Sequence, residues 1–334
     1  MSASNHLSIT PVQKKDLGNT TAEMAGGFRS ELARVLSSPL PFSVERRNAL
    51  CLLPFLALLA WFWQPLVSLV SLTQQQEHYS HIVLIPWLSL YVFYLDRQAI
   101  LTSREWSPWL GSLVVGLGVW WYSRADTTMV ANDQLSMTIF ALVVICWGIF
   151  LSCFGVTVCR KVAFGLLFLL FVVPIPSVLL DAIVGFLQRS SAEATDLLFS
   201  VLGVPVFRQG FVFSLSNFTI HVAEACSGIR SALALFITSV VAGHFFLRAA
   251  CAKMGLVAVV VPLVIIKNAF RIVGLALLAN YVDTTFITNS VLHGSGGIPL
   301  FFFSLIVLFL IVWLLRKVEN RFGCYPPDGL RAEV

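Results

Sequence analysis

The chain has 334 residues, of which 57% are hydrophobic and only 12% are charged. Soluble domains carry about 25% charged residues, so this composition excludes a soluble globular domain and indicates an all-α protein that crosses a membrane several times. The net charge of +5 does not indicate nucleic-acid binding, because the Lys and Arg residues lie between apolar segments and form no patch.

The N-terminal segment differs in composition from the rest of the chain. Residues 1–44 are polar and of mixed composition, and we expect a flexible cytoplasmic tail there. The first apolar run begins near Leu50, directly after Arg46 and Arg47, and is long enough to stay in the membrane as a signal anchor. We expect an integral membrane domain over residues 45–318 and a short cytoplasmic tail over residues 319–334.

The apolar runs predict the number of membrane spans and their orientation. A span needs roughly 20 apolar residues, and the sequence predicts eight, at residues 49–72, 79–96, 109–123, 135–156, 162–180, 226–247, 254–280 and 298–315. Sixteen of the 22 basic residues fall in the segments on one side of these spans. Basic segments stay in the cytoplasm, so both termini are predicted to be cytoplasmic in a cell inner membrane.

Residues 177–225 form the one long segment on the predicted outer side. Residues 178–202 combine an apolar face with polar positions such as Gln188 and Arg189, which is typical of an interfacial or partly buried helix. Residues 204–222 are rich in Val, Phe, Ile and Thr and predict a short β-hairpin over the outer face. The segment is either a lid that guides substrate or a passive loop.

A polar stretch follows at once, with a carboxylate (Glu224), a thiol (Cys226), a hydroxyl (Ser227) and a guanidinium (Arg230) close together. If the next helix starts near Ala225, Cys226 lies in its first turn, where the macrodipole lowers the pKa of a thiol. Arg230 would then lie on the same helical face, four residues on. Taken alone, the stretch fits a nucleophilic cysteine and an ordinary polar helix start equally well.

Two later segments carry further candidates. Lys267, Asn268 and Arg271 lie inside the predicted span at residues 254–280, although a charge at that depth costs roughly 2.5 to 3.5 kcal/mol. The two cations are four residues apart, so they share one helical face, which must contact protein or water. His293 lies in a glycine-rich stretch before the last predicted span, on the same outer side as Cys226.

A second histidine cluster, residues 77–81, lies on the outer side before the second span. It contains His78 and His81, but no further ligands stand at a recognisable spacing, so we expect no metal site there. His81 is the second candidate for a catalytic base. The seven cysteines likewise show no zinc spacing, and we expect no cofactor.

Together these blocks resemble the exosortase and archaeosortase family, whose members are membrane-embedded cysteine transpeptidases. The resemblance covers roughly residues 78–315 and rests on three main blocks: Ala225-Cys226-Ser227-Gly228-Ile229-Arg230-Ser231, Asn268-Ala269-Phe270-Arg271-Ile272, and His293 with the glycines after it. Weaker similarities are Tyr79-Ser80-His81 with Pro86, Pro174-Ile175-Pro176, and Leu202-Gly203-Val204-Pro205-Val206 with Gly210.

The resemblance implies that Cys226 is the nucleophile, that Arg271 stabilises the oxyanion and that His293 transfers protons. It implies substrates that are secreted proteins with a C-terminal signal made of a short motif such as Pro-Glu-Pro, a membrane helix and a basic cluster. The new carboxyl group would pass to an unidentified acceptor, often linked to exopolysaccharide. Glu224 would orient His293 or bind substrate, and Arg230 would bind the acidic residue of the motif.

Two other classes of function remain open at this point. A transporter can use Lys267 and Arg271 to bind an anion within the membrane, but the sequence shows no internal repeat. An assembly factor would have no active site at all. Membrane lipid and the substrate protein are the partners expected for the transpeptidase.

Overall fold

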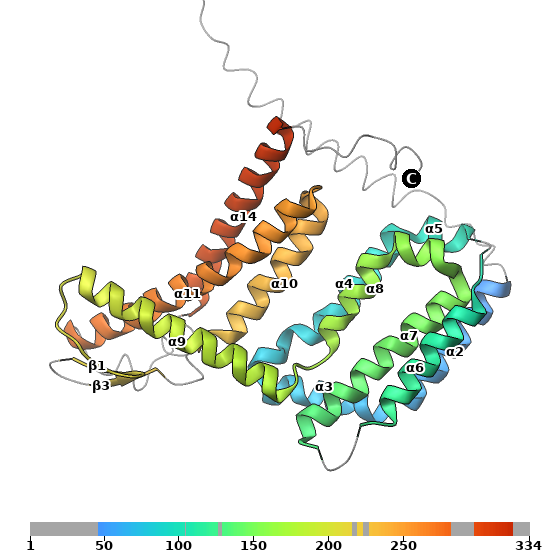
Figure 1. Cartoon of the computed structure of the whole chain (residues 1–334), viewed down its shortest axis with the longest axis horizontal. Coiled ribbons are helices and arrows are strands. Elements are labelled where there is room, and N and C mark those ends of the chain that lie inside the picture. Colours follow the sequence, from blue (N-terminus) through green and yellow to red (C-terminus); the bar gives the residue numbers. More distant parts are fainter. Residues whose placement is uncertain are drawn as a thin grey trace, which may run out of the picture. The chain divides into compact units, whose positions relative to one another are not determined.

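The computed structural model describes residues 46–103, 105–125, 129–215, 219–222, 227–281 and 297–322. These residues form helices almost throughout, together with one small sheet (Figure 1). The chain divides after Leu52 into two units, and the elements below belong to the second unit apart from the first turns of α2. The all-α class is therefore confirmed for the described part of the chain.

The first half of the chain contains short and long helices: α2 (Arg46–Trp61), α3 (Trp63–Gln75), the 3-10 helix η1 (Glu77–Val83), α4 (Leu84–Leu95), α5 (Arg97–Thr102), α6 (Pro108–Tyr122), α7 (Ala131–Lys161), α8 (Ala163–Phe168) and the 3-10 helix η2 (Leu169–Val172). α6 lies along α7 (Figure 1). The two backbones approach closely at Gly111, where an added Cβ would lie 2.6 Å from the carbonyl oxygen of Gly148. Such small-residue contacts are typical of helix packing in membranes.

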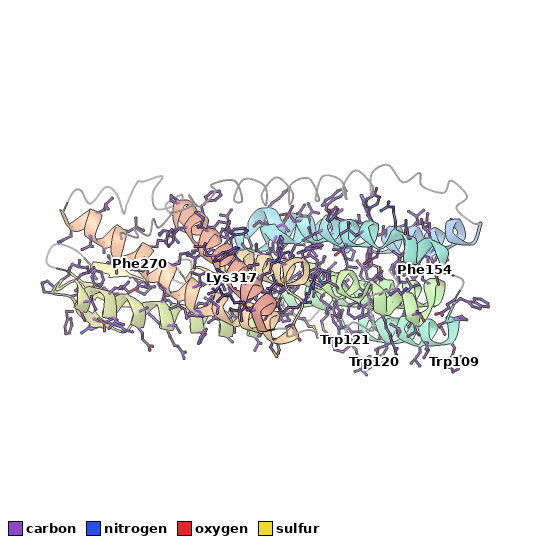
Figure 2. All side chains as sticks on the ribbon, turned by 90° about the horizontal axis from the view of Figure 1, so that it is seen from above. Trp109, Trp120, Trp121, Phe154, Phe270 and Lys317 are labelled. Carbon is purple, nitrogen blue, oxygen red and sulfur yellow. The ribbon has the colours of Figure 1, made fainter. Side chains whose placement is uncertain are left out.

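The second half consists of α9 (Ser177–Val201), β1 (Phe207–Gln209), β2 (Val212–Ser214), β3 (Thr219–His221), α10 (Ile229–Phe246), α11 (Ala250–Tyr281) and α14 (Gly297–Phe322). α11 packs against α9, α10 and α14. Large apolar side chains remain exposed, among them Phe270 on α11 at 53% and Trp109 on α6 at 79% (Figure 2). Exposed apolar faces of this kind are expected where helices contact lipid.

Four helices in the described part of the chain are long and apolar enough to cross a membrane: Ala131–Lys161, Ile229–Phe246, Ala250–Asn280 and Pro299–Arg321. Two bent helix pairs raise that number to as many as six, namely Cys51–Trp61 with Trp63–Gln75 (64°) and Ala163–Val172 with Ser177–Val201 (87°). A multi-pass membrane protein is thus supported, whereas the eight predicted spans are not confirmed. α4 has 12 residues and α6 has 15, both short of the roughly 20 that a span needs.

The predicted span at residues 162–180 is interrupted in the structure. Helical structure ends at Val172 and resumes at Ser177, with Pro174 and Pro176 between them. Proline lacks a backbone N–H and clashes with the preceding turn, so two prolines this close end a helix. The chain therefore bends here and does not continue straight into α9.

Side chains from two other elements hold this bend in place. The Tyr79 hydroxyl on η1 donates to the carbonyl oxygen of Ile175 at 3.1 Å, and the Asn132 amide on α7 donates to the same oxygen at 2.9 Å. The Asp133 carboxylate accepts hydrogen bonds from the Ser177 backbone N–H and hydroxyl, both at 2.6 Å. Asp133 thus caps the first turn of α9 from a neighbouring helix.

In the segment predicted to lie on the outer side, α9 has nearly the predicted bounds, but the sheet has three strands where the sequence predicts a two-stranded hairpin. β2 and β3 form the expected hairpin, and β1 adds a third antiparallel strand through a turn at Gly210, whose φ is +62°. The buried ring of Phe213 packs in one apolar cluster with Phe199 on α9 and Ile272 on α11. The sheet is therefore attached to the two helices that also support the candidate site.

Candidate active site

The start of α10 is set by a glycine in the left-handed region. Gly228 has φ +79° and ψ +14° and immediately precedes the first helical residue, Ile229. A left-handed residue cannot be part of a right-handed helix, so the helix begins here and not near Ala225 as predicted. The described helix thus starts three residues after Cys226 in the sequence, and because Cys226 lies outside the described residues, its predicted i, i+4 relation to Arg230 stays a prediction.

The polar face of α11 lies against this helix start. The buried Lys267 ammonium, 6% exposed, donates a hydrogen bond to the Ser231 hydroxyl. That hydroxyl in turn donates to the carbonyl oxygen of Gly228 at 2.9 Å. Lys267 is therefore connected through one serine to the turn that precedes α10.

Asn268, the next residue of α11, contacts the same turn and also α9. Its side-chain oxygen lies so near Gly228 that an added Cβ there would be 3.2 Å away. Its amide nitrogen donates to the buried Ser191 hydroxyl on α9 at 3.0 Å. The Gly228 turn and the polar face of α11, which are about 40 residues apart in the sequence, are thereby packed together.

α9 supplies a second support that the sequence analysis did not identify. The buried Gln188 amide donates at 2.6 Å to the carbonyl oxygen of Val222, the residue directly after β3. Gln188, Ser191 and Thr195 are all buried and recur three and four residues apart, so they form a polar stripe on one face. That spacing was visible in the sequence and indicated a helix face that contacts polar groups.

Three other predicted site residues lie near the start of α10 or on the α11 face that carries Lys267. Ser227 is fully buried, and in the described part of the chain its hydroxyl has no hydrogen-bond partner. Arg230 is exposed in the first turn of α10. Arg271 is partly buried one turn after Lys267 on α11, so both cations belong to the face that contacts the start of α10.

Three predicted site residues lie outside the described residues: Glu224, Cys226 and His293. Cys226 directly precedes Ser227 in the sequence, and His293 lies between α11 and α14. Their proposed roles therefore remain predictions.

His81, the second candidate base, lies on η1, outside the candidate spans. Its Nδ1 is 2.9 Å from the carbonyl oxygen of His78, and burial lowers the pKa of its imidazole. The ring borders a large cavity that also reaches the start of α10. His81 and the α10 helix start therefore share one cavity.

This cavity has a volume of about 1100 Å³ and is lined almost wholly by apolar side chains. Its walls come from η1, α6, α7, η2, α9, α10 and α11. Its lining includes Ile229, the first residue of α10, and Val264, one turn before Asn268 on α11. An apolar space thus adjoins the polar cluster formed by Ser231, Lys267 and Asn268.

A family model described as transmembrane exosortase matches residues 72–310. The matched region includes η1, the Pro174–Pro176 bend, the start of α10 and the polar face of α11. No curated protein and no solved structure matches the chain.

Proposed function

The chain belongs to the transmembrane exosortase family, and we propose that it cleaves the C-terminal sorting signal of secreted proteins through a thioester on Cys226. Membership supports a general role in processing such signals. The transpeptidase chemistry, the substrates and the residue roles below are our proposal.

The observation that supports this proposal is the contact between the start of α10 and the polar face of α11. The Lys267 ammonium reaches Ser231, and the Asn268 side chain lies against Gly228. Cys226 is two residues before Gly228, and Arg271 is on the same face of α11 as Lys267. A thiol and a guanidinium that start from these positions can converge on one carbonyl group.

In the first step the Cys226 thiolate attacks the carbonyl carbon of the scissile amide, and a C–S bond forms while the carbonyl oxygen becomes negative. Arg271 donates to this oxygen, and a preorganised donor of this kind is worth roughly 3 to 4 kcal/mol. Arginine stays protonated and presents a planar set of donors, which suits this role better than Lys267. The hydroxyl of Ser227 is available to support the same charge.

In the second step the C–N bond breaks, and His293 gives a proton to the leaving amine. The signal departs and the secreted protein remains on Cys226 as a thioester. An acceptor nucleophile then attacks the thioester carbonyl, His293 takes its proton, and the thiolate leaves. Glu224 orients His293 or binds substrate, and Arg230 binds an acidic residue of the recognition motif.

The apolar cavity favours a substrate whose apolar segment lies in the membrane. An apolar segment of the sorting signal lying in this space would bring the adjoining motif to the start of α10. In this proposal Cys226 faces the outer side of the inner membrane, both termini are cytoplasmic, and the small sheet shields the thioester from water.

The experiment is co-expression with a secreted reporter that carries a C-terminal motif, a membrane helix and a basic cluster, with the motif varied across a panel. We expect processing with the parent enzyme and none with Cys226→Ala at equal membrane abundance. Continued processing with Cys226→Ala would eliminate the transpeptidase and leave the transporter or assembly factor.

A further inference from the structure

The position of Lys267 is energetically unfavourable for a charged side chain. Lys267 is buried inside a candidate span, and a charge at membrane depth costs roughly 2.5 to 3.5 kcal/mol. Its ammonium contacts the third residue of α10, at the helix end where the macrodipole disfavours cations. Arg271 adds a like charge one turn away. In the part of the chain that the structure describes, no carboxylate pairs with Lys267.

In the described residues, the hydrogen bond that Lys267 donates leads through Ser231 to one peptide group. Ser231 receives the hydrogen bond from Lys267 and donates its own proton to the Gly228 carbonyl oxygen at 2.9 Å. The backbone N–H of Ala232 donates to the same oxygen, also at 2.9 Å. The orientation of the Gly228 peptide is therefore fixed by the first turn of α10 together with the Ser231 hydroxyl, which Lys267 orients.

We propose that Lys267 is a positioning residue for the reaction: through Ser231 it fixes the Gly228 turn, and with it the place from which the Cys226 thiol attacks. This inference rests on the proposed function. It accounts for a buried cation that pairs with no carboxylate in the described part of the chain. A displacement of about 1 Å in a reacting group can cost about 100-fold in rate, so a positioning role of this kind is large enough to be selected.

The test measures kcat and KM for reporter processing by Lys267→Met and Ser231→Ala in the full-length protein. Each change should lower kcat about 10- to 100-fold and leave KM within about twofold. The double variant should be no slower than the slower single variant, because both changes break the same connection. Ser231→Thr keeps a hydroxyl and should recover most of the rate.

Thermal unfolding separates positioning from a merely structural role. Removal of a buried charge should leave the melting temperature of Lys267→Met unchanged or higher, whereas a structural role requires a lower one. If Lys267→Met does not fold, the two Ser231 variants still decide the question. The matched controls are Ser239→Ala, a buried α10 serine that donates to the carbonyl three residues earlier, and Lys253→Met near the other end of α11. Both should keep the parent kcat.

Three results would overturn the inference. The first is a parent kcat in Lys267→Met. The second is a parent kcat in Ser231→Ala while Lys267→Met is slow, since Lys267 would then act without Ser231. The third is a lowered melting temperature of Lys267→Met, since Lys267 would then have a structural role. Failure of the proposed function is recognised separately, because processing would then persist in Cys226→Ala.

Discussion

The side-chain oxygen of Asn268 lies against Gly228, the residue that immediately precedes α10. Gly228 has φ +79°, a region that other residues occupy at a cost of roughly 1 to 2 kcal/mol. A Cβ at this position would also lie 3.2 Å from the Asn268 oxygen. The left-handed conformation therefore favours glycine, and a side chain at this position would also require Asn268 to shift by a few tenths of an ångström.

We expect Gly228→Ala to lower the free energy of unfolding by about 1 to 3 kcal/mol and to reduce reporter processing at least 10-fold. Thermal unfolding in detergent and the reporter assay measure the two effects. Gly255→Ala on α11 is the control, since a Cβ there meets no atom within 4 Å. Parent activity in Gly228→Ala would show that the turn does not need its left-handed glycine.

The polar stripe on α9 leads to a second prediction. Gln188→Leu removes the donor to the Val222 carbonyl directly after β3 and leaves that buried acceptor without its side-chain partner. We expect a loss of about 1 to 3 kcal/mol in the free energy of unfolding, because an unsatisfied buried acceptor loses its hydration without compensation. Arg189→Gln, at the adjacent exposed position, should have little effect. Equal melting temperatures for the two variants would contradict the assigned role of Gln188.

The apolar cavity can be tested by filling it. Ala232 lines the cavity one turn into α10, and Ala232→Trp would occupy part of its volume. If the signal's apolar segment binds there, KM for the reporter should rise about 10-fold or more, with the membrane abundance of the enzyme unchanged. Thr238→Trp places the same ring at an exposed position of α10 and should leave KM unaltered. An unchanged KM in Ala232→Trp would remove the cavity from substrate binding.

Substitution of each candidate base in turn shows which histidine is the catalytic base. His293→Ala should reduce kcat by about 100- to 10,000-fold, the range for loss of a general acid or base. His81→Ala should reduce processing only weakly, because His81 borders the cavity and already bonds the His78 carbonyl. Steady-state kinetics on both variants decides between them. The opposite order of effects would make His81 the base.

The long apolar helices could be predicted from the sequence, and details that depend on single backbone conformations could not. The helix predicted at residues 254–280 is observed as Ala250–Tyr281, because sustained apolar composition determines it. The start of α10 was misplaced because the sequence does not show that Gly228 is left-handed. The sequence predicts residues 162–180 as one span, whereas the helix is interrupted at Pro174 and Pro176, and the 87° bend there is held by tertiary contacts at Ile175 and Ser177.

The candidate site was predicted in part. Lys267 is identified by the cost of a charge inside a span and Asn268 by its place in the same polar block, whereas their contacts with Ser231 and Gly228 are not predictable from spacing. The sequence predicts an interfacial or partly buried helix around Gln188, because helical periodicity alone does not reveal which neighbour a polar face such as that of Gln188 and Ser191 contacts. Their burial against Val222 and Asn268 comes from the packing of α9 on α11.

The most direct measurement of the central claim is mass spectrometry of the full-length enzyme after brief incubation with the reporter and acid quenching. The proposal predicts a peptide containing Cys226 that carries the C-terminal residue of the cleaved reporter as a thioester, which hydroxylamine releases. His293→Ala should accumulate less of this adduct than the parent enzyme. An enzyme that processes the reporter with no adduct on Cys226, or with the adduct on another residue, would contradict the account.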